Sequence, residues 1–156
     1  MEMLPGEIKK TIVINAPASV VFKALTDEND LIKWMPSEAK MDARIGGAYE
    51  FKYHWAERNV DSTTRGEILE LIPNRKLSYT WDSSRRTEIE TSSSPLQSSI
   101  VTWTLEELSK TKTRVTLTHR GIAREMSQDS DRGWTHFIAQ LARYSEEQAS
   151  AGNMPK

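Results

Sequence analysis

Four aromatic side chains alternate with polar ones in the segment AYEFKYHW, and this pattern restricts the fold more than any other feature of the chain. The aromatic positions are Tyr49, Phe51, Tyr53 and Trp55, and the polar positions between them are Glu50, Lys52 and His54. Successive side chains of a β-strand point to opposite faces, so a period of two places all four rings on one face. Because an apolar face must be buried, the segment predicts a strand in a sheet covered by a second layer.

The same alternation recurs along much of the chain. Five further segments are predicted strands: 8–14, 63–72, 75–81, 100–108 and 113–119. The inward positions of the last three are Leu77, Tyr79, Trp81, Val101, Trp103, Leu105, Val115, Leu117 and His119. Gly46 and Gly47 predict a turn before the aromatic strand, since glycine adopts positive φ readily. Short connections between consecutive strands favour an antiparallel meander.

Helical spacing replaces this alternation near the C-terminus. From residue 129 or 130, one side of a helix of about four to five turns collects the apolar residues. They are Trp134, Phe137, Ile138, Leu141 and Ala142, followed by the small Ser145. Two short helices are predicted after the first strand, because Pro17 suits a first helical position and Pro36 ends a helix after Trp34. The sequence predicts one α+β domain over residues 1–156, with its ordered core at about 8–146.

Composition excludes several classes of function. Lys and Arg number 21 against 22 Asp and Glu, and the net charge of −1 gives no electrostatic footprint for nucleic acid. The chain has no cysteine, hence no disulfide and no thiolate nucleophile. No apolar run reaches the roughly 18 residues of a membrane span, and MEMLPGEIKK lacks the apolar core of a signal peptide. We therefore expect a cytoplasmic protein that neither binds nucleic acid nor spans a membrane.

A serine-rich polar stretch, DSSRRTEIETSSSPLQSS, separates two of the predicted strands at residues 82–99. Connections of this length are usually functional lids or disordered insertions. Two interpretations stay open for it, a mobile hairpin extension and a specific lid.

The inward faces also leave two interpretations of the interior. The long C-terminal helix is the only predicted element large enough to cover the sheet. Bulky rings rarely fill a core without gaps, so sheet and helix can enclose an aromatic-lined pocket; a solid core is the alternative. The residues expected to bind a ligand in such a pocket are Tyr49, Phe51, Tyr53, Trp55, Tyr79, Trp81, Trp103, His119, Trp134, Phe137 and Leu141.

Few titratable groups are predicted to face this interior. His54 and His136 are expected to point outward, so we expect no metal site, and no motif indicates a cofactor. His119 faces inward and is the one weak candidate for a catalytic residue, as a general base or as a hydrogen-bond partner of a ligand. A buried histidine bonded to tyrosine or to backbone is the alternative.

Five stretches, taken in their order and spacing, resemble a known family. They are TIVINAPASVVFKALTDENDLIKWM, RIGGAYEFKYHW, GEILELIPNRKLSYTW, TRVTLTHRGI and GWTHFIAQLARY, which together extend over residues 8–146. This set resembles the activator of heat-shock protein 90 ATPase-like family. That family belongs to the START-like (SRPBCC) superfamily, together with the birch pollen allergen, lipid-transfer START domains and polyketide cyclases.

The resemblance implies a helix-grip fold. In this fold a curved antiparallel sheet of about six to seven strands wraps around a long C-terminal helix, with two short helices after the first strand. It also implies that Trp34 lies near a cavity entrance, as a gate or as part of the core. The fold hosts binders, carriers, cyclases and co-chaperones, so it does not fix the function.

We expect a stress-related protein that binds a small hydrophobic or aromatic molecule. One alternative is a cyclase, dehydratase or hydrolase that uses His119 with Tyr53 or Tyr79. The other is a chaperone-associated interaction module. The chaperone activator that names the family carries an additional N-terminal domain, for which we expect no room in this chain.

Overall fold

The structure is a computed structural model, and it describes residues 6–55, 60–86, 99–122 and 127–152. The strands are β1 (Gly6–Ile14), β2 (Glu38–Met41), β3 (Ala48–Trp55), β4 (Val60–Ile72), β5 (Lys76–Arg86), β6 (Ser99–Ser109) and β7 (Lys112–Ile122). The helices are α1 (Ala18–Thr26), α2 (Glu28–Trp34) and α3 (Ser127–Gly152).

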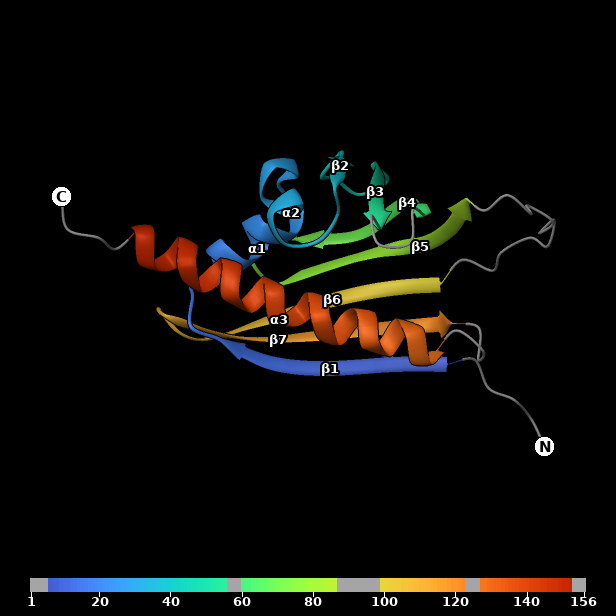
Figure 1. The fold of residues 1–156 in the computed structure, drawn as a ribbon. Coiled ribbons are helices and arrows are strands. Elements are labelled where there is room, and N and C mark those ends of the chain that lie inside the picture. The colour runs from blue at the N-terminus through green and yellow to red at the C-terminus, as the bar shows by residue number, and fades with distance from the viewer. Residues whose placement is uncertain (1–5, 56–59, 87–98, 123–126, 153–156) are drawn as a thin grey trace, which may run out of the picture.

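The strands form one 7-stranded antiparallel sheet in the order β1-β7-β6-β5-β4-β3-β2. Consecutive strands from β2 to β7 are neighbours, which confirms an antiparallel meander for these six strands, and β1 pairs with β7 instead of β2. In Figure 1, α3 lies along one face of the bent sheet, and α1 and α2 lie beside it at the end where β2 and β3 are found. The α+β class, the helix-grip fold and the two short helices after the first strand are therefore confirmed.

Two carboxylates fix the helices: Asp27 caps α2, and Asp30 connects it to α1 and α3. Asp27 caps α2, where its side chain accepts a hydrogen bond from the backbone N–H of Asn29 at 2.8 Å. One turn later, the buried Asp30 accepts hydrogen bonds from Lys23 of α1 and from the hydroxyl of Tyr144 of α3. The two short helices are thereby held against the long one.

Several elements extend beyond their predicted ends. α3 has 26 residues, more than the predicted four to five turns, because the apolar stripe marks only the part that packs on the sheet. β4 begins before its predicted start at residue 63, and β5 continues past its predicted end at residue 81. Asp61 pairs with Arg86 in these added parts. These polar ends are held by main-chain pairing and carry no apolar alternation. Part of the predicted 82–99 loop is therefore strand, and residues 87–98 lie outside the described residues.

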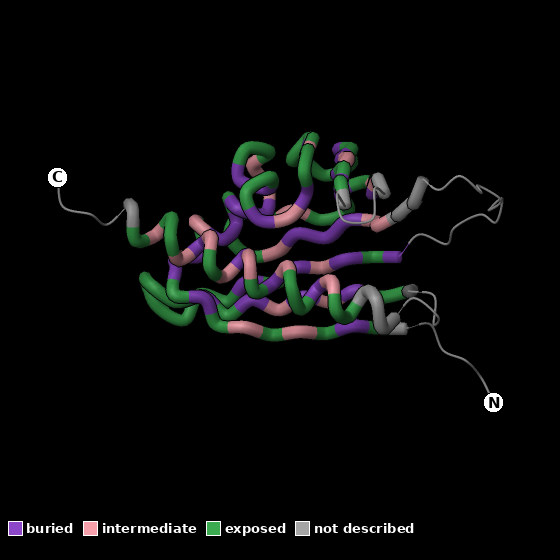
Figure 2. The backbone as a smooth tube through the Cα atoms, in the orientation of Figure 1, coloured by how far each residue is buried: buried purple, intermediate pink, exposed green. Residues whose placement is uncertain are grey.

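Buried residues concentrate on the sheet face that meets α3 (Figure 2). β6 shows the rule most clearly, since Val101, Trp103 and Leu105 are buried while Thr104 between the last two is exposed. The inward positions predicted for β7, which are Val115, Leu117 and His119, are buried as well. The core thus lies between the sheet and the helices, and the predicted faces are correct for these strands.

Candidate functional site: an aromatic cluster between sheet and helix

Rings from four strands and from α3 meet in one group. We call the following residues the aromatic cluster: Tyr49, Phe51, Tyr53, Tyr79, Trp81, Trp103, His119, Trp134 and Phe137. Trp81 of β5 and Trp134 of α3 lie with their ring centroids 5.1 Å apart, and those of Trp103 and Trp134 are 5.6 Å apart. These contacts join the sheet to the helix, and their separations are typical of favourable aromatic pairs.

Two polar contacts on the sheet side of the cluster join its rings to each other and to the backbone. The indole N–H of Trp103 donates to the hydroxyl of Tyr79 at 2.8 Å, and the hydroxyl of Tyr49 donates to the carbonyl of Thr80. Burial raises the pKa of Tyr79, and the bond from Trp103 opposes this only in part. Tyr79 is therefore a neutral hydrogen-bonding group at physiological pH.

His119 stands at the centre of a directed chain of hydrogen bonds. The indole N–H of Trp134 donates to Nδ1 of His119 at 2.9 Å. Nδ1 must then be unprotonated, so in the neutral ring the hydrogen lies on Nε2 and is donated to Oγ of Ser99 at 2.7 Å. Ser99 in turn donates to the carbonyl of Trp81 at 2.9 Å. Each donor in this chain has one acceptor, and the imidazole tautomer follows.

Burial lowers the pKa of His119 to about 4, because charging the ring would cost desolvation energy. The ring is thus neutral near pH 7. A general base takes up a proton on its free nitrogen, and Nδ1 already accepts from Trp134. Catalysis by His119 would require that bond to break first, and its use as a base stays a prediction.

The structure brings most of the predicted ligand-binding residues together. Tyr49, Phe51, Tyr53, Tyr79, Trp103, His119, Trp134 and Leu141 are buried, and Trp81 and Phe137 are partly exposed. The side chain of Trp55 lies outside the described residues. Ser99 was missed, although extending the alternation of Val101 and Trp103 back by one step would have placed it on the inner face. The role of all these residues in binding stays a prediction.

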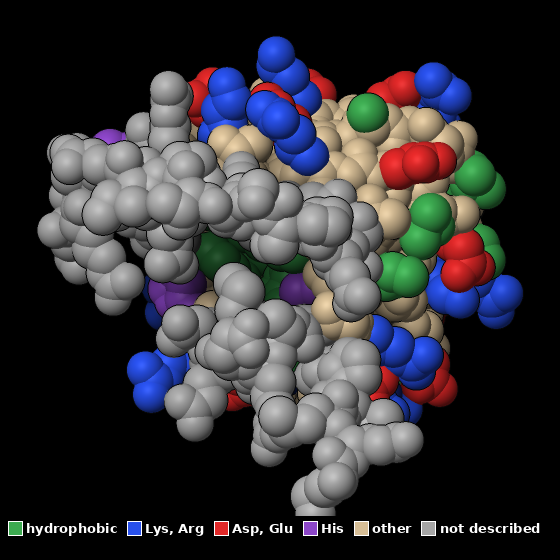
Figure 3. Space-filling model, turned by 90° about the vertical axis from the view of Figure 1, so that its right-hand side faces the viewer, with side chains coloured by type: hydrophobic (Ala, Val, Ile, Leu, Met, Phe, Trp, Pro, Cys, Tyr) green, Lys and Arg blue, Asp and Glu red, His purple; other side chains and the backbone are tan. Residues whose placement is uncertain are grey.

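The molecular surface is hollowed next to these elements. Figure 3 looks at the end of the molecule where α3 begins, and hydrophobic and histidine side chains are visible inside a hollow there. A cleft of about 270 Å³ lies between α2, β3 and α3. We call it the α2–α3 cleft, and its lining includes Lys33, Ser37, Tyr53, His136, Phe137 and Gln140.

Trp34 is buried, and its indole N–H donates to the carbonyl of Ala24 at 2.8 Å. Its ring packs edge-on against Trp103, and the residue also lines the α2–α3 cleft. Trp34 therefore belongs to the core, at a point where the core reaches an opening. Within the described ranges, no three His, Cys, Asp or Glu side chains are grouped so that they could hold a metal ion. No helix in those ranges is long and apolar enough to cross a membrane.

A bent antiparallel sheet gripping a long helix through an aromatic interior defines a START-like helix-grip protein. Residues 15–146 match the family described as Activator of Hsp90 ATPase homolog 1-like protein, and the chain belongs to this family. The resemblance seen in the sequence is thereby confirmed. No curated protein matches the sequence.

Solved structures share this fold. Protein CV1439 from Chromobacterium violaceum is 28% identical with a TM-score of 0.75, and the match covers 91% of this chain and 99% of that one. CalU16 from Micromonospora echinospora is 24% identical with a TM-score of 0.69, covering 94% and 85% of the two chains. The Aha1 dimer from Colwellia psychrerythraea is 19% identical with a TM-score of 0.72, covering 90% and 96%. The last two likenesses show the fold alone.

Proposed function

We propose that the protein binds a small hydrophobic molecule, aromatic or lipid-like, between the sheet and α3. One observation carries this proposal. Trp81 contacts the rings of Phe51, Tyr79, His119 and Trp134, and yet its side chain stays partly exposed. An inner-face tryptophan that four rings do not cover leaves apolar surface for a ligand. The hollow in Figure 3 supports the same placement.

The chemistry of the cluster favours an apolar ligand over a polar one. The N–H and O–H groups of Trp103, Tyr49, Trp134 and Ser99 already donate to protein acceptors. A polar ligand would have to compete with these bonds, whereas an apolar ligand gains about 25 cal/mol for each Å² that it buries. Flat rings gain further from edge-to-face contacts with the indoles.

The other functions considered have weaker support. An enzyme would depend on His119, whose two ring nitrogens both bond to protein atoms. A chaperone-associated role is supported by the family description alone. A cytoplasmic location and a role in stress stay predictions from the sequence.

Thermal unfolding in the presence of hydrophobic compounds tests the proposal. We expect one class among fatty acids, flavonoids, polyketide-like aromatics and sterols to raise the melting temperature in a concentration-dependent way. A ligand at a hundred times its Kd adds about 2.7 kcal/mol to the free energy of unfolding. Phe137→Ala should weaken this shift relative to the variant's own baseline, and Leu108→Ala, at an exposed position of β6, should not. Stabilisation by none of the four classes would contradict the proposal.

A further inference from the structure

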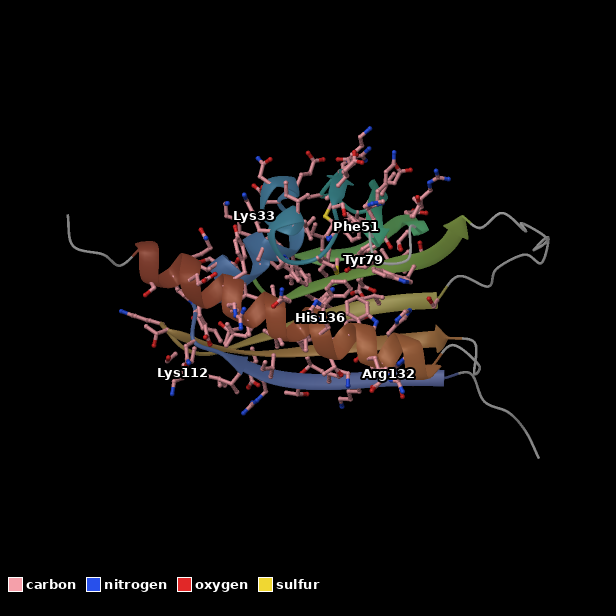
Figure 4. All side chains as sticks on the ribbon, in the orientation of Figure 1. Lys33, Phe51, Tyr79, Lys112, Arg132 and His136 are labelled. Carbon is pink, nitrogen blue, oxygen red and sulfur yellow. The ribbon has the colours of Figure 1, made fainter. Side chains whose placement is uncertain are left out.

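The α2–α3 cleft differs from the aromatic cluster in its charge. Lys33 comes from the last turn of α2, His54 from β3 and His136 from α3, and all three side chains are exposed. Lys33 supplies a positive charge, and the ammonium and both imidazoles can donate hydrogen bonds. The described residues that line the cleft include no carboxylate. Figure 4 shows Lys33 and His136 on the two helices that border the cleft.

Neutral donors add to this set. The hydroxyl of Ser37 accepts a hydrogen bond from the backbone N–H of His54 at 3.1 Å, which leaves its own hydrogen to donate elsewhere. The amide of Gln140 lines the same space. Charge and hydrogen-bond donors from α2, β3 and α3 therefore face one cleft, an arrangement suited to an anionic oxygen group.

Two rings link the cleft to the aromatic cluster. Tyr53 and Phe137 line the cleft, and their ring centroids are 6.0 Å apart. The ring of Phe137 is in turn 6.5 Å from that of Trp134, which contacts Trp81. The volume of about 270 Å³ is just below the range of pockets that hold a whole drug-sized ligand. The α2–α3 cleft is therefore large enough for one end of a ligand whose other end lies within the aromatic cluster.

We propose that the α2–α3 cleft binds the carboxylate of an amphipathic acid, with Lys33 as its charged partner, His136 as a hydrogen-bond donor, and Tyr53 and Phe137 as the wall toward the apolar end. This inference rests on the proposed function, and it narrows the ligand class from hydrophobic molecules to aromatic or aliphatic carboxylic acids. An alcohol of the same size would keep the apolar contacts and lose the charged ones.

A matched pair of ligands tests the inference, phenylbutyrate and its uncharged analogue phenylbutanol. We would titrate each into the protein and follow the backbone amide signals by NMR, at one pH and ionic strength. We expect phenylbutyrate to bind about fivefold more tightly, as one exposed charge pair can provide. Phenylbutyrate alone should shift the amides of Ser37 and Gln140. Lys33→Gln and His136→Gln should each reduce this preference, and Lys112→Gln, which removes the same charge as Lys33→Gln at the start of β7, should not.

The outcomes separate the two proposals. Equal affinities for acid and alcohol, unchanged in Lys33→Gln, would overturn the carboxylate site and leave hydrophobic binding intact. Shifts confined to the cleft with phenylbutyrate, and none with phenylbutanol, would support the carboxylate site and contradict binding within the cluster. No shift with either compound at millimolar concentration would overturn the carboxylate site, and the thermal test with the four compound classes would then decide hydrophobic binding.

Discussion

The imidazole of His119 is held in its neutral form by the direction of its hydrogen bonds as well as by burial. Protonation would place a hydrogen on Nδ1, directly opposite the N–H that Trp134 already presents to that atom. Two donors facing each other at this distance repel, and the Trp134 bond that joins α3 to the sheet would be lost. His119 therefore couples the protonation state of one residue to the packing of the helix on the sheet.

Stability should fall in acid because of this residue. The pKa of His119 is about 4 in the folded protein, whereas an unfolded histidine titrates near about 6.5. Between these values the unfolded chain takes up a proton that the folded protein does not, so the free energy of unfolding decreases as the pH falls. The stabilisation is complete above about pH 6.5, and about 3 kcal/mol of it should be lost on reaching pH 4.

Urea denaturation across this pH range measures the effect, with His119→Gln as the reference. Carboxylates titrate in the same range in both proteins, so only the difference between the two curves reports on His119. The variant should be less stable than the wild type near pH 7, and the gap should narrow toward pH 4. A difference in stability between the two proteins that stays constant with pH would show that folding does not lower the pKa of His119.

Among the strands, β4 depends on a residue without a side chain. Gly66 pairs with Tyr49 across the β3–β4 ladder, where the hydroxyl of Tyr49 donates to the carbonyl of Thr80 on β5. A Cβ atom at position 66 would lie 2.1 Å from that carbonyl oxygen and 2.7 Å from the ring of Tyr49. Gly66 therefore allows an aromatic ring to lie over the backbone where three strands meet.

Gly66→Ala should destabilise the protein by about 2 to 3 kcal/mol, because backbone and ring must both move. Gly133→Ala is the matched control, since no atom beyond its own stretch of α3 lies within 4 Å of a Cβ at that position. There the substitution should stabilise the protein by up to about 1 kcal/mol through helix propensity. Equilibrium unfolding in urea measures both changes, and equal effects of the two substitutions would contradict this account of Gly66.

Sequence periodicity predicted these elements well and their ends poorly. The alternation in β3, β6 and β7 reflects one face that meets the core and one that meets water, and burial follows it. The added parts of β4, β5 and α3 carry no regular apolar spacing in the sequence, and main-chain hydrogen bonds form there whatever the side chains are. The cap of α2 by Asp27 depends only on near neighbours in the chain.

At the scale of the whole molecule, the sequence indicated which residues meet but not how they bond. The inward phases of His119 and Trp134 were visible, yet their hydrogen bond joins residues 15 apart on different elements. Ser99 completes the chain only through the register of β5 against β6. The α2–α3 cleft takes two of its donors, His54 and His136, from positions expected to point outward, so no pattern on a single element could reveal it.

Protection against hydrogen exchange should be uneven across the sheet, and this bears on how a ligand enters. β6 and β7 have strand neighbours on both sides and cover the core, whereas β2 is an edge strand of 4 residues paired only with β3. We expect amides of β6 and β7 to exchange only through global unfolding and those of β2 through smaller openings. Native-state exchange followed by NMR measures this order, and equal protection of β2 and β6 would contradict it. Because β2 packs against α2, which borders the α2–α3 cleft, these openings would let a ligand reach the interior without unfolding the rest of the sheet.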